Sequence, residues 1–185
     1  MKKNLILFFI FPFLICLSNF FPVYKINAAN ESIVCPGLKM FKNWCAGEHM
    51  QDNNKVCLIV ARPINSKGNY KKRGMTTATV YRLPAQDNQN IFYITAGYQY
   101  KNESFVTINV DGKDKFELKL IENDAAWTDD DSVDKDIIEA LKKGIRMTVI
   151  GYSSRGTKTT DMYSLSGFTA AYKHIVQNCD ISQIE

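Results

Sequence analysis

An alternation of apolar and polar residues around an Asp-Gly pair constrains this chain more than any other feature. From 105 to 110 every second residue is a branched apolar one, so one face of an extended segment carries Val106, Ile108 and Val110. Asp111-Gly112 follows, a dipeptide typical of a tight hairpin turn. The same period resumes in Phe116, Leu118 and Leu120. The segment is therefore predicted to be an antiparallel β-hairpin with one buried face.

Short runs rich in β-branched and aromatic residues recur along the rest of the chain, with turn residues between them. Six more strands are predicted in this way: Met40–Ala46, Lys55–Arg62, Thr76–Leu83, Ile91–Tyr100, Ile145–Tyr152 and Thr159–Leu165. Two segments have helical periodicity instead, Ser132–Lys143 with Gly144 at its end and Ser166–Gln177 with Ser166 as its N-cap. About eight short strands and two short helices, one of them C-terminal, predict an all-β, antiparallel β-sandwich or barrel-like domain.

The N-terminal segment, residues 1–28, has the three parts of a secretion signal. Lys2 and Lys3 form a basic start, an apolar run extends from 5 to 17, and Ala28 is a small residue suited to cleavage. A membrane anchor is the alternative, but the uninterrupted apolar run is shorter than the roughly 20 residues that a spanning helix needs. We expect a signal peptide over 1–28 and one domain over 29–185, with no stable membrane span after cleavage.

The formal net charge of +4 belongs largely to the predicted signal. Lys2, Lys3 and Lys25 contribute three of those charges, so the mature domain is close to neutral. A nearly neutral domain gives no overall electrostatic reason to expect nucleic acid as a partner. Within the domain, one polar and basic loop is expected, over residues 65–73.

Four cysteines remain once Cys16 is removed with the signal: Cys35, Cys45, Cys57 and Cys179. An even number in an exported chain predicts two disulfide bonds, and four cysteines allow three pairings that the residues alone do not distinguish. A zinc site is disfavoured because the chain has no Cys-x-x-Cys pair, and His49 and His174 are far apart in the sequence.

No familiar catalytic motif is present in the sequence. The Glu48-His49 pair resembles a base and its orienting group, but it is equally typical of a polar turn, and His174 is expected to be a partly exposed helix residue. Nucleophile-elbow, phosphate-loop, dinucleotide-binding and zinc-protease motifs are all missing. We predict no catalytic residues, no cofactor and no metal, and hence a protein that is not an enzyme.

Two residue groups have both a structural and a functional interpretation. The first is an acidic run that precedes and enters the first predicted helix: Asp124, Asp129, Asp130, Asp131, Asp134 and Asp136. Its spacing lacks the glycine and final glutamate of a calcium loop, so we predict that Asp130 or Asp131 caps the helix and that Trp127 is buried near Val133 or Ile137. The second group, which forms either core pairs or a recognition patch, is Tyr93, Tyr98, Tyr100 and Phe105.

An ordered series of short segments between Trp44 and Cys179 resembles the invasion-associated locus B family of exported alphaproteobacterial proteins. The most specific of them is Ser-Leu-Ser-Gly-Phe-Thr-Ala-Ala at 164–171, preceded by Gly-Tyr-Gln-Tyr-Lys at 97–101 and Ala-Trp at 126–127. The resemblance implies a sandwich-like domain in the periplasm or envelope, linked with host-cell entry, and no catalytic residues. Many members have a cysteine pair in mid-domain, where this chain has 123–131 with Trp127 and no cysteine.

In the branch of the family that this chain resembles, the implied pairs are Cys57–Cys179 and Cys35–Cys45. A local hairpin argument instead pairs Cys45 with Cys57 and leaves Cys35 with Cys179. The segment Ser166-Gly167-Phe168 has a folding interpretation that needs no family: Ser166 caps the last helix, Gly167 permits a sharp turn, and Phe168 anchors the helix.

Three functions remain open from the sequence. The first is a non-enzymatic protein of the periplasm or outer envelope, or a secreted one, that contacts an unknown protein or envelope partner and contributes to host-cell interaction. The second is a housekeeping, chaperone-like or envelope-stabilising factor. The third, a hydrolase, is disfavoured because no nucleophile–base motif is present.

Overall fold

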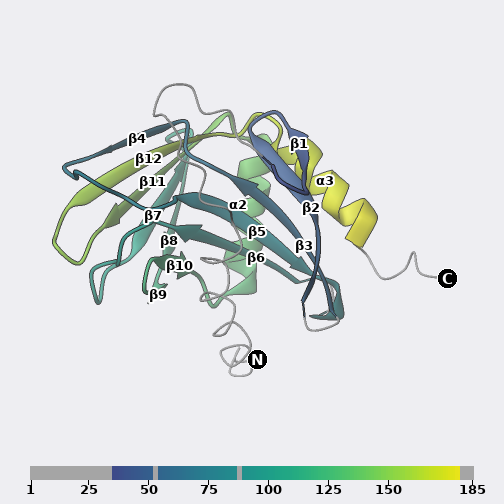
Figure 1. Ribbon diagram of the computed structural model, residues 1–185, viewed down its shortest axis with the longest axis horizontal. Helices are drawn as coiled ribbons and strands as arrows, with labels where there is room; N and C mark the ends of the chain where they lie inside the picture. Colours follow the sequence, from purple (N-terminus) through teal and green to yellow (C-terminus); the bar gives the residue numbers. More distant parts are fainter. Residues whose placement is uncertain (1–34, 52–53, 87–88, 180–185) are drawn as a thin grey trace. The chain divides into compact units, whose positions relative to one another are not determined.

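Two antiparallel sheets and two helices make up the described part of the protein, in a sandwich-like arrangement (Figure 1). The computed structural model describes residues 35–51, 54–86 and 89–179. The predicted secretion signal lies outside the described residues, so its cleavage stays a prediction. Within the described residues, no helix is long and apolar enough to cross a membrane.

The larger sheet has seven strands, and each neighbouring pair in it is antiparallel. In spatial order they are β1 (Lys39–Phe41), β2 (Trp44–Gln51), β3 (Asn54–Ala61), β5 (Thr77–Leu83), β6 (Gln89–Thr95), β10 (Ala125–Trp127) and β9 (Leu120–Glu122). A 3-10 turn, η1 (Pro84–Gln86), follows β5. The register places Ile59 opposite Val80 and Val80 opposite Phe92, and all three side chains are buried. One face of this sheet therefore supplies much of the core.

The smaller sheet has five strands in the order β4 (Asn65–Gly68), β12 (Lys158–Ser164), β11 (Arg146–Tyr152), β7 (Val106–Val110) and β8 (Asp114–Leu118). The predicted hairpin is confirmed as β7 and β8, with Asp111 at φ 53° and Gly112 at φ 74° in its turn. The register pairs Val110 with Asp114, so three residues connect the strands, and the Lys113 N–H donates to the Val110 carbonyl at 3.0 Å. Val106, Ile108 and Val110 are buried, as their alternation predicts.

Two helices complete the core between and beside the sheets. Helix α2 (Asp131–Lys143) packs against β6, and helix α3 (Phe168–Cys179) packs against β2 and β3. In Figure 1, α3 lies beside β1 and β2. Phe168 is fully buried with its ring edge-on to Trp44 at 4.9 Å between ring centroids, so its predicted role as the anchor of the last helix is confirmed.

The predicted fold class is confirmed, but the described residues contain twelve strands rather than about eight. Four of the strands are only three or four residues long: β1, β4, β9 and β10. The predicted strand Met40–Ala46 is a hairpin, because the chain reverses at Lys42, whose φ is 54°. Such short strands are defined by their partners, not by a period of two in their own sequence.

The acidic run has a structural role at the start of α2. Asp130 is the N-cap: its carboxylate accepts hydrogen bonds from the backbone N–H of Ser132 at 2.8 Å and from the Ser132 hydroxyl at 2.6 Å. Asp134, in the first turn, is buried and accepts the backbone N–H of Phe92 at 3.0 Å, which joins α2 to β6. The predicted cap is therefore confirmed, while Asp129 and Asp136 are exposed.

The predicted burial of Trp127 is partial rather than complete. Trp127 is half-buried and ends β10, where it lies opposite Tyr93 of β6 and Leu120 of β9. Its neighbour Ala126 belongs to the core instead. Because successive strand residues point to opposite faces, a buried Ala126 turns Trp127 to the other side of the sheet.

Two glycines lie at the predicted positions, Gly144 at the end of α2 and Gly167 in the turn before α3. Gly144 ends α2 at φ −81°, which any residue adopts, and is needed because a Cβ there would lie 2.5 Å from the Val110 side chain. Gly167 has a φ of 99°, and any other residue there would place its Cβ against the carbonyl oxygen of Phe41. Both the positive φ and the close contact require glycine. Helix α3 begins at Phe168, and Gly167 rather than Ser166 occupies the capping position, because its carbonyl accepts the Ala171 N–H at 2.9 Å.

Candidate functional site

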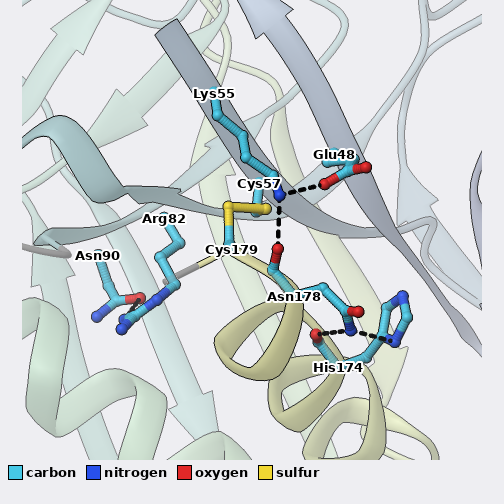
Figure 2. The surroundings of a disulfide bond; sticks show 8 residues. All are labelled: Glu48, Lys55, Cys57, Arg82, Asn90, His174, Asn178 and Cys179. Atoms are coloured by element: carbon cyan, nitrogen blue, oxygen red, sulfur yellow. Dashed lines mark hydrogen bonds and ion pairs between the residues drawn. A yellow bond between two sulfur atoms is a disulfide. The ribbon is translucent and has the colours of Figure 1, made fainter. Parts of the chain in front are cut away.

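The four cysteines form two disulfide bonds, Cys35–Cys45 and Cys57–Cys179, with Cα–Cα distances of 5.7 and 6.1 Å. This is the pairing that the family resemblance implies, and the local pairing of Cys45 with Cys57 is wrong. Cys57 lies in β3 and Cys179 is the last residue of α3, so the second bond fastens the final helix to the larger sheet (Figure 2). The first bond fastens the chain before β1 to β2.

A cleft of about 400 Å³ lies beside the Cys57–Cys179 bond, between β2, β3 and α3. Its polar lining comes from side chains that are far apart in the sequence, namely Glu48, Lys55, His174 and Asn178 (Figure 2). The antiparallel pairing of β2 with β3 brings the first two together, because the register places Glu48 opposite Cys57. The cleft is therefore a concave feature in which polar groups from two strands and a helix converge.

Lys55 is the central cation of this cleft. Its ammonium group lies 2.7 Å from the Glu48 carboxylate and donates a hydrogen bond of 2.6 Å to the backbone carbonyl of Asn178. That carbonyl belongs to the last turn of α3, where orphan carbonyls and the helix dipole favour a positive charge. Lys55 therefore caps α3 at the point where the disulfide holds it.

His174 is half-buried on α3, as the sequence predicts. Its ring Nδ1 lies 3.0 Å from the Asn178 side-chain amide, and its ring centroid lies 5.2 Å from that of Phe41. In the described part of the chain, no hydrogen bond links His174 to a carboxylate or a hydroxyl, the groups that an acid–base or nucleophilic pair needs. The side chain of His49, the other candidate, lies outside the described residues.

A second polar cluster, which the sequence did not predict, lies inside the sandwich. Arg73 forms a two-pronged ion pair with Asp161, with nitrogen–oxygen distances of 2.6 and 2.7 Å, and donates a third bond of 2.6 Å to the carbonyl of Ala96. The two charged side chains are only 7% and 3% exposed. Burial alone would lower the pKa of Arg73, but the hydrogen bonds and charge of Asp161 outweigh it and raise that pKa. The guanidinium is therefore held charged, with its donors satisfied.

Aromatic rings and hydroxyls surround this ion pair. The guanidinium carbon of Arg73 lies 4.9 Å from the ring centroid of Tyr98 and 5.5 Å from that of Tyr70. The Tyr98 hydroxyl lies 2.6 Å from that of Thr159, which shares the inward face of β12 with Asp161. The predicted loop 65–73 is wrong over 65–68, which form β4, so the cluster fastens the loop at 69–73 and the loop at 97–101 to the smaller sheet.

The four aromatic candidates separate into different environments. Tyr100 is in the core, Tyr98 covers Arg73, and Tyr93 stacks on Tyr81 with 5.3 Å between ring centroids. Phe105 is 47% exposed. Burial raises the phenol pKa of five tyrosines above its ordinary value: Tyr81, Tyr93, Tyr98, Tyr100 and Tyr163. These tyrosines form cross-strand and core pairs, and of the four candidates Phe105 alone is an exposed ring.

Neither polar cluster assembles a metal centre. Within the described residues, no group of three or more histidine, cysteine, aspartate or glutamate side chains is placed to hold an ion. Asp124, at the start of the acidic run, is half-buried, and its main-chain carbonyl accepts the Ala96 N–H at 2.8 Å. Burial raises the pKa of its carboxyl group.

Comparison with known proteins places the chain in a family. The sequence model described as "Invasion associated locus B (IalB) protein" matches residues 44–176. The crystal structure of invasion associated protein B from Bartonella henselae superimposes with a TM-score of 0.56 and 17% sequence identity, covering 76% of this chain and 95% of that one. At this identity the similarity shows a common fold. A search of curated proteins gives no match. Since the family match extends over more than half of its length, the chain belongs to the invasion associated locus B family.

Proposed function

We propose that this protein is a non-enzymatic, exported protein of the cell envelope that contributes to the interaction of a bacterium with host cells. The observation that carries the proposal is the family match over 44–176, because the family is named for invasion. The structural relative from Bartonella henselae is likewise titled an invasion associated protein.

The two disulfide bonds support the exported location. Disulfides form and persist in the periplasm and outside the cell, whereas thiols are kept reduced in the cytosol. Cys57 and Cys179 are each 1% exposed, which protects the bond that holds the last helix. The basic and apolar residues at 1–28 supply the signal that such a location requires. The proposed compartment is the periplasm or the outer envelope.

The interactions inside the two polar clusters support a non-enzymatic role. Lys55 is engaged with Glu48 and with the end of α3, and Arg73 is engaged with Asp161. The Lys55–Asn178 and Arg73–Asp161 bonds join elements that are distant in the sequence, as bonds that stabilise a fold do. The activity expected of such a domain is binding, for which the rigid sandwich presents its loops and faces.

The test is a gene deletion in the organism that encodes the protein, complemented with the full chain and with Cys57→Ala/Cys179→Ala. The deletion is expected to lower entry into cultured host cells, the full chain to restore it, and the exported protein to begin near Ala29. Growth in medium and detergent resistance are measured in parallel. Normal entry would overturn the proposal, and reduced entry accompanied by slow growth and detergent sensitivity would instead support the housekeeping role.

A further inference from the structure

The two ends of the smaller sheet differ in their balance of charge. The β7–β8 hairpin turns at one end, where Asp111 and Asp114 stand beside Lys113 and Lys115. Because β11 runs antiparallel to β7 and pairs Met147 with Val110, the β11–β12 hairpin turns at the opposite end. The loop that follows β4 lies at that same end, since Gly68 pairs with Thr159. Figure 1 shows these two turns projecting on one side of the molecule, at the left of the view.

Six exposed basic residues gather at this second end, which we name the basic end: Lys67, Lys71, Lys72, Lys101, Arg155 and Lys158. They come from three separate segments that the sheet register and the loop hydrogen bonds bring together, including the bond from the Lys101 N–H to the Tyr152 carbonyl at 2.9 Å. Glu103 is the acidic residue exposed among them. In the described part of the chain, none of the six takes part in an ion pair.

Exposed aromatic rings accompany these charges. Tyr152 is 40% exposed and pairs with Lys158, while Phe105 precedes β7 on the same outward face. Tyr70, which adjoins Lys71, is 37% exposed. The outward positions next along the two strands are Thr107 and Ile150, which lie opposite each other. The basic end therefore offers exposed aromatic rings, with Lys158 opposite Tyr152 and with Thr107 and Ile150 next along the strands.

The buried ion pair gives this surface a fixed shape. Arg73 directly follows Lys72, and its bonds to Asp161 and to the Ala96 carbonyl hold the loop against β12. The Gly74 N–H also donates to the Gly97 carbonyl at 2.9 Å. A basic loop that is already ordered loses less conformational entropy when it binds a ligand. Such pre-organisation distinguishes a binding surface from a solvated run of lysines.

We propose that the basic end binds an anionic polysaccharide. Carboxylate or sulfate groups of such a polymer would pair with the ammonium and guanidinium groups, and its sugar rings would stack on Tyr70, Phe105 and Tyr152. A membrane is less well matched, because interfacial insertion needs a large apolar face, whereas Phe105, Ile150 and Tyr152 form a small group beside Thr107 and Lys158. The inference deepens the proposed function and rests on it for the biological setting, since an anionic glycan would be met outside the cell.

The test uses the exported protein purified from the periplasm, with heparin and polygalacturonate as anionic probes, neutral dextran as a control, and anionic phospholipid vesicles as the competing class. Binding is measured by calorimetry at low and at physiological salt. The protein is expected to bind the anionic polymers and not dextran. Lys71→Glu/Lys72→Glu is expected to weaken binding by about tenfold or more, since each 1.4 kcal/mol is tenfold.

Three further variants separate this surface from general charge attraction. Lys113→Glu/Lys115→Glu makes the same charge change at the opposite end and is expected to leave binding nearly unchanged. Phe105→Ala and Tyr152→Ala are expected to weaken it several-fold even at high salt. Equal losses in the two charge-reversal variants, binding to dextran, or binding to vesicles but not polymers would overturn the proposal. This assay uses purified protein, so a negative result would refute only the binding of an anionic polysaccharide. The host-cell role is tested separately by the entry assay.

Discussion

Removing the two disulfide bonds separately is the sharpest test of how this fold is stabilised. Both bonds join described elements, but they close loops of very different length, with sequence separations of 122 and 10 residues. The perturbation is Cys57→Ala/Cys179→Ala in one variant and Cys35→Ala/Cys45→Ala in the other. Each variant removes the same atoms, so the comparison isolates the closed loop from the chemistry of the substitution.

The loop-closure relation gives the expected magnitudes. A bond that closes the longer loop lowers the entropy of the unfolded chain by an amount equivalent to about 4.9 kcal/mol at 25 °C, and the shorter loop gives about 2.7 kcal/mol. The Cys57–Cys179 variant is therefore expected to lose about 2 kcal/mol more stability than the other. Its sulfur atoms are also the more deeply placed, because Cys57 and Cys179 both belong to the core, whereas Cys35 is half-buried.

Urea denaturation of both variants and of the intact protein, followed by tryptophan fluorescence, measures these differences. The midpoint should fall in both variants and fall further for Cys57→Ala/Cys179→Ala, with a larger m-value if its unfolded chain becomes more expanded. Equal losses, or a larger loss from the Cys35–Cys45 variant, would refute the loop-length reasoning. A free thiol in the native, unreduced protein would refute the pairing itself.

Asp161→Asn leaves the Arg73 guanidinium buried without its counter-charge and should lower the free energy of unfolding by about 3–5 kcal/mol in urea, whereas Arg73→Leu/Asp161→Leu should lower it less. Asp130→Ala should cost about 0.5–2 kcal/mol, because the α2 cap is lost. Thermal melts with calcium and with EDTA should coincide; a Tm several degrees higher with calcium, lost in Asp131→Asn, would identify a metal site. The five tyrosines with raised pKa should resist ionisation in an absorbance titration until the protein unfolds, so the stability they supply is complete below about pH 10 and is lost as the pH rises above it.

The alternation in the sequence was sufficient to predict most of the long elements. Helix α2 begins one residue before its predicted start, and the buried face of β7 is the predicted one. The three-residue strands β9 and β10 were not predicted, because neither is long enough to show a period. Their pairing depends on β6, which lies about thirty residues earlier in the chain. The partial exposure of Trp127 was not predicted for the same reason, because the pairing of β10 sets the orientation of its side chain.

The interior ion pair was missed although one half of it carried a signal. Asp161 alternates with Thr159 and Tyr163 along a predicted strand, so all three share a face, and Tyr163 and Thr159 are buried. A carboxylate at a buried strand position requires a partner, because an isolated buried charge is strongly unfavourable. The identity of that partner was hidden, since Arg73 ends a loop with Lys71 and Lys72 beside it. Only the folded structure shows that the Arg73 side chain is buried while its neighbours Lys71 and Lys72 are exposed.

The burial of Arg73 links the stability of the domain to the basic end, on which Lys71 and Lys72 lie. The loop that follows β4, residues 69–73, has little apolar area to bury, so on composition alone it would remain mobile. Arg73 changes this outcome, because its charge is taken into the sandwich and matched there by Asp161 and by the Ala96 carbonyl. Lys71 and Lys72, which directly precede Arg73, are then held in the loop at the end of the sheet where β11 turns into β12, and both are exposed. The same interaction that closes the core therefore shapes the basic end, and weakening it should disturb binding without altering any residue of the surface.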